Sequence, residues 1–509
     1  MFCKIRSFSI FGIKAIPVDV EVNTSMGLPS FTLVGLPDNA VRESRERVVS
    51  AIRSIGKVVT GFYTTVNISP ADLRKESCPL DLPLAIGLMV ATLEIEVPKL
   101  ERLIFVGELS LDGLLKPVSG ALAIAMKIDK RSDDILVIPR ENESEVSVVK
   151  GVRYICAGSL KELVKILESG AMESSKISSG LCEKNPINVY EEGFPDFKDI
   201  IGMDNVKRAL EIAAAGSHNF LLVGSPGSGK TTCARCFPGI LPEMTDYEIQ
   251  ETSTIHSISY GARFGKSFEP ITSRPFRQPH CSVSMISLVG GGSLMKPGET
   301  ALAHNGVLFL DDIPEFNRIV LEALREPIET GFTSITRASG TVVYPSRFIL
   351  GAAMNPCPCG YSMDPKRECT CIPEARKRYR EKISGPVLDR IDIQVSVQPI
   401  DVYQYASNSN VETSYDIRKR VCAAREIQRV RFKGTKFSTN SEMNFVTAKE
   451  SCKMSAVTEK FLVASAEKLG LVARDYHRIL KVSRTIADIR NSDSVEIADL
   501  SEALRYRVF

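Results

Sequence analysis

A glycine-rich octapeptide, GSPGSGKT, occupies residues 224–231 and limits the folds open to this chain. It fits the pattern G-x-x-x-x-G-K-[ST], follows an apolar run that ends at Val223, and opens a predicted helix, as the pattern requires. Glycines let backbone N–H groups close around phosphate oxygens, and the start of a helix adds a favourable electric field. The pattern therefore predicts a parallel α/β sheet with a phosphate-binding loop. The residues of this loop are Gly224, Ser225, Pro226, Gly227, Ser228, Gly229, Lys230 and Thr231.

The last two residues of the motif have distinct predicted roles. Lys230 reaches the β- and γ-phosphates of ATP, and the Thr231 hydroxyl binds Mg²⁺. The alternative is a chance glycine-rich turn, which the motifs that follow along the chain disfavour.

Two further apolar runs end in polar residues that suit the same site. GVLFLDD, residues 306–312, predicts a buried strand that ends at Asp311, a Mg²⁺ ligand, and Asp312, which polarises the attacking water. FILGAAMN, residues 348–355, predicts a strand that ends at Asn355, which senses the γ-phosphate or positions that water. An acidic turn and a strand-capping asparagine are the non-catalytic alternatives.

Length and composition describe an ordinary globular protein of several domains. A chain of 509 residues is too long for one core, so we expect two to four domains. The formal net charge is only +3, so any basic surface must be local. The N-terminal sequence is not typical of a signal peptide, and no apolar run is long enough to span a membrane. We therefore expect a cytoplasmic protein whose cysteines are free thiols or metal ligands.

Changes in composition divide the chain into four segments. Residues 1–168 mix strand-like runs with helical stretches and predict an α/β or α+β domain. Residues 169–195 have no hydrophobic period and predict a linker. Strand–turn–helix units recur over residues 196–400, as in a parallel α/β sheet, and residues 401–509 are mostly helical.

Several runs in combination resemble a known family. The chain is similar to the magnesium-chelatase-like AAA+ proteins of the YifB/ComM type over essentially its whole length. The resemblance implies an AAA+ core with a helical lid, assembled into a hexameric ATPase. It also implies a DNA partner, single-stranded or branched, and branch-migration helicase activity in recombination or natural transformation. The runs that carry the resemblance are GSPGSGKT, NGVLFLDDIPEF, AAMNPCPCGY, SGPVLDRIDI and LVARDYHRILKVSRTIADI.

The resemblance also implies roles for two arginines. Arg390 in LDRID matches the arginine finger that acts on the ATP of the neighbouring subunit, and Arg474 in VARDYHR matches sensor 2 in the lid. A surface salt bridge is the alternative role of each. The chain departs from the family at Asp312, where most members carry glutamate. Because aspartate is one methylene shorter, we expect a working but slow ATPase.

The N-terminal domain resembles that of Lon protease. Ser77 and Lys75 are out of register with the serine and lysine of a Lon-type peptidase, whose slots fall near Pro79 and Leu122. A serine–lysine dyad needs both groups within hydrogen-bonding reach. We therefore expect a Lon-like fold without peptidase activity.

Four of the 13 cysteines lie within a loop at residues 357–371. Cys357, Cys359, Cys369 and Cys371 form two C-x-C pairs, which suit the tetrahedral thiolate coordination of Zn²⁺. Metal-free reduced thiols and a redox switch are the alternatives.

Two segments are candidates for contact with DNA phosphates. One is a predicted basic helix with Arg418, Lys419, Arg420, Arg425, Arg429, Arg431, Lys433 and Lys436. Its alternatives are a solvated face or a subunit interface. The other is a glycine-rich loop at residues 287–298 that could line the pore of a ring, with Lys296 and the nearby Arg277 and His280.

The sequence thus favours an ATP-driven DNA motor. Three other functions are compatible with parts of it. A metal-chelatase motor subunit would share the AAA+ core, an ATP-dependent protease is disfavoured by the missing dyad, and a non-catalytic ATP-binding scaffold is supported only by Asp312.

Overall fold

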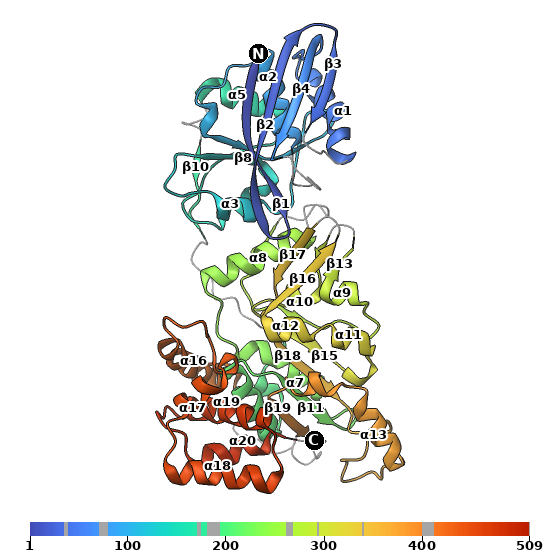
Figure 1. The fold of residues 1–509 in the computed structure, drawn as a ribbon, viewed down its shortest axis with the longest axis vertical. Helices are drawn as coiled ribbons and strands as arrows, with labels where there is room; N and C mark the ends of the chain where they lie inside the picture. Colours follow the sequence, from blue (N-terminus) through green and yellow to red (C-terminus); the bar gives the residue numbers. More distant parts are fainter. Residues whose placement is uncertain are drawn as a thin grey trace.

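The computed structural model describes residues 1–34, 39–70, 80–170, 175–180, 194–260, 268–292, 295–337, 340–399 and 412–507. The molecule is elongated, with its N-terminal part at one end (Figure 1). A central part follows, and the C-terminal helices pack beside it at the other end. Within the described ranges, none of the helices combines the length and the apolar character that crossing a membrane requires.

The N-terminal part is built on a mixed eight-stranded sheet in the order β10-β9-β8-β5-β1-β2-β4-β3. Alternation along β2 buries Val18, Val20 and Val22 on one face, against the almost wholly buried helix α2. The strands are β1 (Phe2–Phe11), β2 (Lys14–Met26), β3 (Ser30–Val34), β4 (Phe62–Ser69), β5 (Leu103–Phe105), β8 (Ile135–Pro139), β9 (Arg153–Ala157) and β10 (Lys176–Ile177). The helices are α1 (Asn39–Ser54), α2 (Asp81–Ala91), α3 (Ala121–Lys127), α4 (Glu143–Ser147) and α5 (Leu160–Gly170), and β6 (Glu108–Leu109) pairs with β7 (Leu115–Lys116).

Two sequence-based expectations fail at the edges of this sheet. The apolar run FTLVGLP at residues 31–37 indicates a buried strand, but its described part belongs to β3, an edge strand whose side chains remain partly or fully exposed. The predicted linker at residues 169–195 is not wholly a connection, because Lys176–Ile177 adds to the opposite edge of the sheet by pairing with β9. Ser77 and Lys75 lie outside the described residues.

The central part contains a five-stranded parallel sheet in the order β12-β15-β18-β11-β19. The three middle strands are continuous apolar runs and are buried throughout, as expected for a parallel sheet covered on both faces. The strands are β11 (Phe220–Gly224), β12 (Phe276–Arg277), β15 (Val307–Leu310), β18 (Ile349–Met354) and β19 (Ile393–Val397). Because they are parallel, Gly224, Leu310 and Met354 meet at the same edge.

Helices and short hairpins surround this sheet. The helices are α6 (Asp204–Gly216), α7 (Lys230–Cys236), α8 (Asp246–Tyr260), α9 (Met285–Val289), α10 (Glu299–Leu302), α11 (Arg318–Glu322), α12 (Arg325–Thr330), α13 (Pro373–Glu381) and α14 (Gly385–Leu388). The hairpins pair β13 (Gly290–Gly291) with β14 (Lys296–Pro297), and β16 (Phe332–Arg337) with β17 (Gly340–Pro345).

The N-terminal part rests on α8 and on the β16–β17 hairpin (Figure 1). Phe11 and Ile13 pack against the apolar face of the hairpin, which includes Val342. On α8, the Ser257 hydroxyl donates to the buried carboxylate of Glu145 over 2.9 Å. Apolar and polar contacts thus join the two parts.

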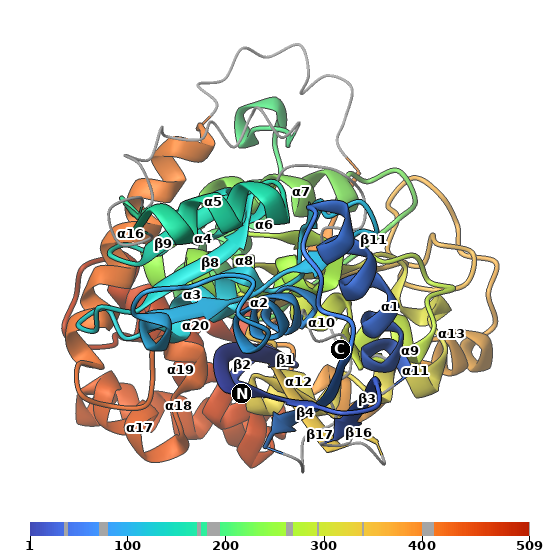
Figure 2. The same cartoon turned by 90° about the horizontal axis from the view of Figure 1, so that it is seen from above.

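The C-terminal helices pack together on one side of the molecule, opposite α9, α11 and α13 (Figure 2). They are α16 (Ser414–Arg431), α17 (Phe445–Cys452), α18 (Ala456–Leu469), α19 (Ala473–Ile489) and α20 (Ile497–Arg505). His218, at the end of α6, is fully buried and bridges Asp392 and Thr485, at 2.8 Å from each. This contact joins the central sheet to α19.

Candidate nucleotide-binding site

The P-loop at residues 224–231 joins β11 to α7. Gly229 has a φ of +87°, a left-handed conformation that glycine adopts without strain, and it places Lys230 at the start of the helix. The Ser228 hydroxyl oxygen is buried and has no hydrogen-bond partner among the described residues. The loop therefore has the shape and the spare hydrogen-bonding capacity that fit a phosphate ligand.

Lys230 is buried, and its ammonium group lies among oxygens of the same site. Its Nζ atom donates to the carbonyls of Gly224 and Ser225, over 2.8 and 3.0 Å, and to Oδ1 of Asn355 over 3.2 Å. Burial lowers the pKa of Lys230, and the carboxylates of Asp312 and Asp311 oppose this shift. A phosphate group beside the ammonium would stabilise its charged form further.

Thr231 and Asp311 meet across the sheet edge. The Thr231 hydroxyl donates to Oδ2 of Asp311 over 2.8 Å, although β18 separates the strands that lead to these two residues. Gln278, which no sequence motif indicates, places its amide nitrogen 3.5 Å from the same oxygen. A hydroxyl and a carboxylate at this position are the oxygen ligands that Mg²⁺ prefers.

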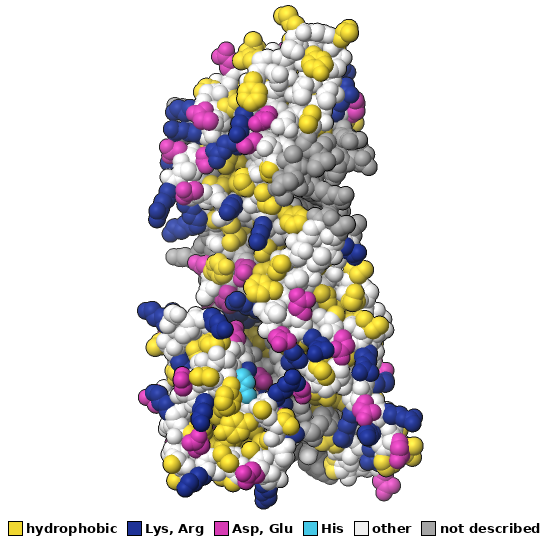
Figure 3. Space-filling model, in the orientation of Figure 1, with side chains coloured by type: hydrophobic (Ala, Val, Ile, Leu, Met, Phe, Trp, Pro, Cys, Tyr) yellow, Lys and Arg dark blue, Asp and Glu magenta, His cyan; other side chains and the backbone are white. Residues whose placement is uncertain are grey.

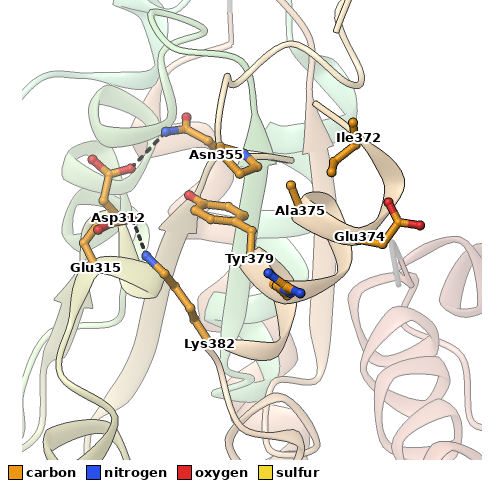
Figure 4. A pocket seen from close by; sticks show the side chains of 10 residues that line it. Asp312, Glu315, Asn355, Ile372, Glu374, Ala375, Tyr379 and Lys382 are labelled. Carbon is orange, nitrogen blue, oxygen red and sulfur yellow. Dashed lines mark hydrogen bonds and ion pairs between the residues drawn. The ribbon is translucent and has the colours of Figure 1, made fainter. Parts of the chain in front are cut away.

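Asp312 follows Asp311 with a left-handed φ of +50°, which turns its carboxylate toward Asn355. The Asn355 amide nitrogen lies 3.4 Å from Oδ1 of Asp312 (Figure 4). Burial raises the pKa of Asp312, assisted by the negative charges of Asp311 and Glu315 and opposed by Lys230. A carboxylate with a raised pKa accepts a proton more readily, as a general base must.

A cavity of about 580 Å³ opens beside Asp312, between the turn after β15 and α13. Asp312, Glu315, Asn355 and Tyr379 line it, and Lys382 pairs with Glu315 over 3.1 Å at its margin (Figure 4). No P-loop residue lines this cavity, but Asn355, which accepts a hydrogen bond from Lys230, does. Tyr379 and Lys382 carry no recognisable signature in the sequence.

Arg390 and Arg474 lie far from the phosphate loop of their own chain. Arg474 pairs with Asp389 over 2.5 Å, directly beside Arg390, which pairs with Glu329 over 2.5 Å. Both arginines lie near the amino end of β19, where Ile393 is in register with Phe220.

The register of β11 and β19 determines how far the two arginines lie from the P-loop. Gly224 lies four residues beyond Phe220, which is roughly 13 Å along a strand. The structure therefore groups the two arginines together, on the opposite edge of the sheet from Lys230.

The four cysteines of the 357–371 loop converge, with all four Sγ atoms within 4.8 Å of one another. They lie in the connection between β18 and α13, close to the P-loop.

Most arginines of the predicted basic helix are not available to a ligand, which corrects the sequence-based expectation for this segment. Arg418 donates to the carbonyl of Gly239 and Arg425 to that of Ala214, because this face of α16 packs on the central part. Arg420 pairs with Glu211 and Arg431 with Asp488, each over 2.5 Å. Lys419, Lys433 and Lys436 remain exposed, as does Arg429, which forms an ion pair with Glu426 over 2.7 Å.

The described residues of the glycine-rich segment at 287–298 include the end of α9 and the paired strands β13 and β14. The Arg277 guanidinium forms a bidentate ion pair with the Glu299 carboxylate, with nitrogen–oxygen distances of 2.6 and 2.8 Å. His280 is bonded to the Ser282 hydroxyl, and Lys296 is exposed on β14.

Comparison with known proteins identifies the family of this chain. Three family models match it: "Subunit ChlI of Mg-chelatase" over residues 20–142, "Magnesium chelatase, subunit ChlI" over residues 196–405, and "Magnesium chelatase, subunit ChlI C-terminal" over residues 411–507. The competence protein ComM of Haemophilus influenzae is 40% identical over 505 residues, which cover 99% of this chain and 97% of that protein. The protein YifB of Escherichia coli is 40% identical over 507 residues, which cover 99% and 96%.

A more distant relative is the magnesium-chelatase subunit ChlI of the Chlamydomonas reinhardtii chloroplast. It is 26% identical over 184 residues, which cover 32% of this chain and 44% of that protein. The full-length matches, together with a parallel sheet that gathers a P-loop, two aspartates and an asparagine at one edge, show that this chain belongs to the YifB/ComM type of the magnesium-chelatase-like AAA+ family.

Proposed function

We propose that this protein is an ATP-driven, ring-forming motor that acts on DNA. The observation that carries the proposal is the division of the site between two edges of one sheet. Lys230, Thr231 and Asp311 gather at the carboxyl edge, whereas Arg390 and Arg474 lie at the amino edge. A site that needs all of these groups forms only between two copies of the chain.

Each residue at the carboxyl edge has a role that follows from its contacts. Lys230 exchanges its carbonyl partners for the β- and γ-phosphates of ATP, while Asn355 moves from the ammonium group to the attacking water. Thr231 and Asp311 hold Mg²⁺, which would neutralise charge on the phosphates when bound. Asp312 accepts a proton from the attacking water, consistent with its raised pKa.

Arg390 and Arg474 complete the site of the neighbouring subunit. A guanidinium keeps its charge and offers a planar fork of donors, which suits a phosphoryl group in transfer. In the isolated chain these arginines pair with Glu329 and Asp389, partners that a neighbour's phosphates would replace.

An apolar surface on the lid supports assembly. Hydrophobic side chains gather on the exposed face of the C-terminal helices (Figure 3). Val472, an exposed hydrophobic residue of this region, lies two residues before Arg474, so burying it against a neighbour would also bring that arginine to the interface. The exposed large hydrophobic residues of the C-terminal region include Phe445, Val446, Val457, Val463, Leu469 and Val472. We propose a homo-hexamer as the active assembly.

DNA is the proposed substrate, and branch migration in recombination or transformation the proposed process. A relative that matches over 97% of its length is named a competence protein, and competence is the uptake of DNA. The exposed cations Lys296, Lys419, Arg429, Lys433 and Lys436 provide local positive charge for phosphate contact on a chain of net charge +3.

The proposal is tested by ATPase measurements with single-stranded, duplex and branched DNA. We expect DNA to stimulate turnover, with the greatest effect from single-stranded or branched substrates, and we expect the stimulation to fall with salt. Equal turnover with and without every DNA form would contradict the DNA assignment. A porphyrin-dependent turnover in the same assay would instead favour a chelatase motor, whose family models match the chain.

Asp312 allows a direct test of the hydrolytic role. Asp312→Asn is expected to lower ATP turnover by about 10²-fold, because the amide cannot accept a proton from water. Nucleotide affinity should change little, because Lys230, Thr231 and Asp311 are intact. Phosphate release measures turnover, and a fluorescent ATP analogue measures affinity.

The matched variant is Glu315→Gln, at the second acid of the same cavity. Full activity in Asp312→Asn combined with loss in Glu315→Gln would move the base to Glu315. Full activity in both would favour a passive role for this acidic turn, as in an ATP-binding scaffold.

We further propose that residues 1–168 adopt a Lon-like fold without peptidase activity, and that 196–400 and 401–509 are the AAA+ core and its lid. At the slot of the peptidase lysine, Leu122 is a fully buried side chain near the start of α3. Alongside ATP and Mg²⁺, we propose Zn²⁺ at the four-cysteine cluster. A reducing cytoplasm suits thiolate ligands of this kind.

A further inference from the structure

Four thiols meet at one point of the loop between β18 and α13. Sγ of Cys357 lies 3.3 Å from that of Cys359 and 3.6 Å from that of Cys369, and the last two are 3.5 Å apart. Cys371 accepts a hydrogen bond from the backbone N–H of Cys359 over 3.3 Å. All four cysteines are free thiols, and Cys357 is fully buried.

This spacing suits a tetrahedral metal ion. Zinc–sulfur bonds of about 2.3 Å place the sulfurs of a tetrahedral site about 3.8 Å apart, close to the separations seen here. Four thiolates fill the coordination shell and leave no open position for a substrate, which is the arrangement of a structural site. A metal at this point would fix both C-x-C pairs and therefore the nine residues between them.

The same loop packs directly on the P-loop. Gly360 has a φ of +88° and approaches Pro226 so closely that a Cβ at residue 360 would lie 2.6 Å from Cδ of the proline. The hydroxyl of Ser225 donates to the carboxylate of Asp364, which also accepts from the backbone N–H of Lys366 over 2.8 Å. Apolar and polar contacts thus connect the cysteine loop to residues 225 and 226.

Both ends of the cysteine loop connect to residues around Lys230 and Asp312. Cys357 lies two residues after Asn355, which bonds to Lys230. At the other end, the Arg376 guanidinium donates to the carbonyl of Cys371 over 3.1 Å and ties the loop to α13. That helix carries Tyr379 into the cavity beside Asp312.

We propose that the four cysteines bind one Zn²⁺ and that the zinc-bound loop holds the P-loop and Asn355 in the arrangement that binds nucleotide. The proposal rests on the proposed function in so far as residues 224–231 bind ATP. Without the metal, the loop loses its fixed ends, and ordering it becomes an entropic cost of nucleotide binding.

The first test is the metal content of protein purified under reducing conditions without added metal. Elemental analysis is expected to give about one zinc per chain. Replacement of zinc by Co²⁺ should give the visible absorption bands of a tetrahedral tetrathiolate site. A zinc content near zero with no cobalt spectrum would overturn the metal site.

The second test distinguishes the effect of losing the metal from the effect of disturbing the contact between the cysteine loop and the P-loop. Cys369→Ser is expected to lose zinc and to weaken the binding of a fluorescent ATP analogue by at least about tenfold. Gly360→Ala should keep its zinc and weaken binding in the same direction, because the added methyl group overlaps Pro226. The control is Cys422→Ser, at an exposed thiol outside the cluster, which should change neither quantity.

The outcomes distinguish this proposal from the proposed function. Loss of zinc in Cys369→Ser with unchanged nucleotide affinity would overturn the coupling. If Cys369→Ser does not fold, Gly360→Ala decides, and wild-type affinity in that variant would overturn the coupling too. A zinc-loaded wild-type protein that binds no nucleotide would reject the coupling together with the proposed function and leave the metal site standing.

Discussion

Lys230→Ala is expected to reduce ATP turnover by at least about 10³-fold, because the site loses the only positive charge that the described P-loop residues place against the phosphates. The alanine cannot replace the contacts that Nζ makes with Gly224, Ser225 and Asn355. Nucleotide binding should weaken as well, because the phosphate charge is no longer compensated. Phosphate release and the rate of migration of a three-stranded DNA junction are the measurements.

The control for this variant is Lys165→Ala, at an exposed lysine on α5 in the N-terminal part. It should retain wild-type turnover and junction migration. A Lys230→Ala protein that migrated junctions at the wild-type rate would reject the ATP-driven motor. Loss of turnover in the control would trace the effect to general damage instead.

Arg390→Ala is expected to bind ATP almost normally and to hydrolyse it about 10³-fold more slowly, the usual effect of removing an arginine finger. The reason is positional, since Arg390 lies near the amino end of β19 and cannot reach the phosphates of its own chain. Arg474→Ala should behave similarly, because it shares that edge through Asp389. The exposed Arg53 on α1, in the N-terminal part, provides the control substitution.

A mixing experiment isolates the action between subunits. Equal amounts of Arg390→Ala and Lys230→Ala protein should regain part of the activity, because some boundaries in mixed rings pair an intact P-loop with an intact finger. No recovery in rings shown to be mixed would remove Arg390 from the neighbouring site.

The grouping of residues at the carboxyl edge of the central sheet could be predicted from the sequence, because these residues occur in short motifs at strand ends. The apolar runs that stop at Gly224, Asp311 and Asn355 predict parallel strands, and parallel strands have their carboxyl ends at the same edge of a sheet. The structure brings these residues to that edge. The cysteine cluster was predictable for the same reason, since two close pairs in 15 residues can meet in few ways.

Other features depend on contacts that the local sequence does not encode. From the sequence, Arg420 and Arg431 are expected to be surface cations. Their carboxylate partners Glu211 and Asp488 are distant in the chain, and these ion pairs help to determine which face of α16 is buried. The edge position of the strand at Ser30–Val34 depends on sheet order in the same way. Gln278 and Tyr379 reach the site through packing of separate elements, without a motif.

The separation of Arg390 from Lys230 has a consequence for enzyme concentration. If each site takes its arginines from a second chain, a single chain has no complete site, and an open assembly always has one fewer complete site than it has chains. Only a closed ring gives every P-loop a partner. Turnover per chain should therefore rise with total protein concentration until rings saturate, and the midpoint of that rise would report the affinity of one subunit for the next.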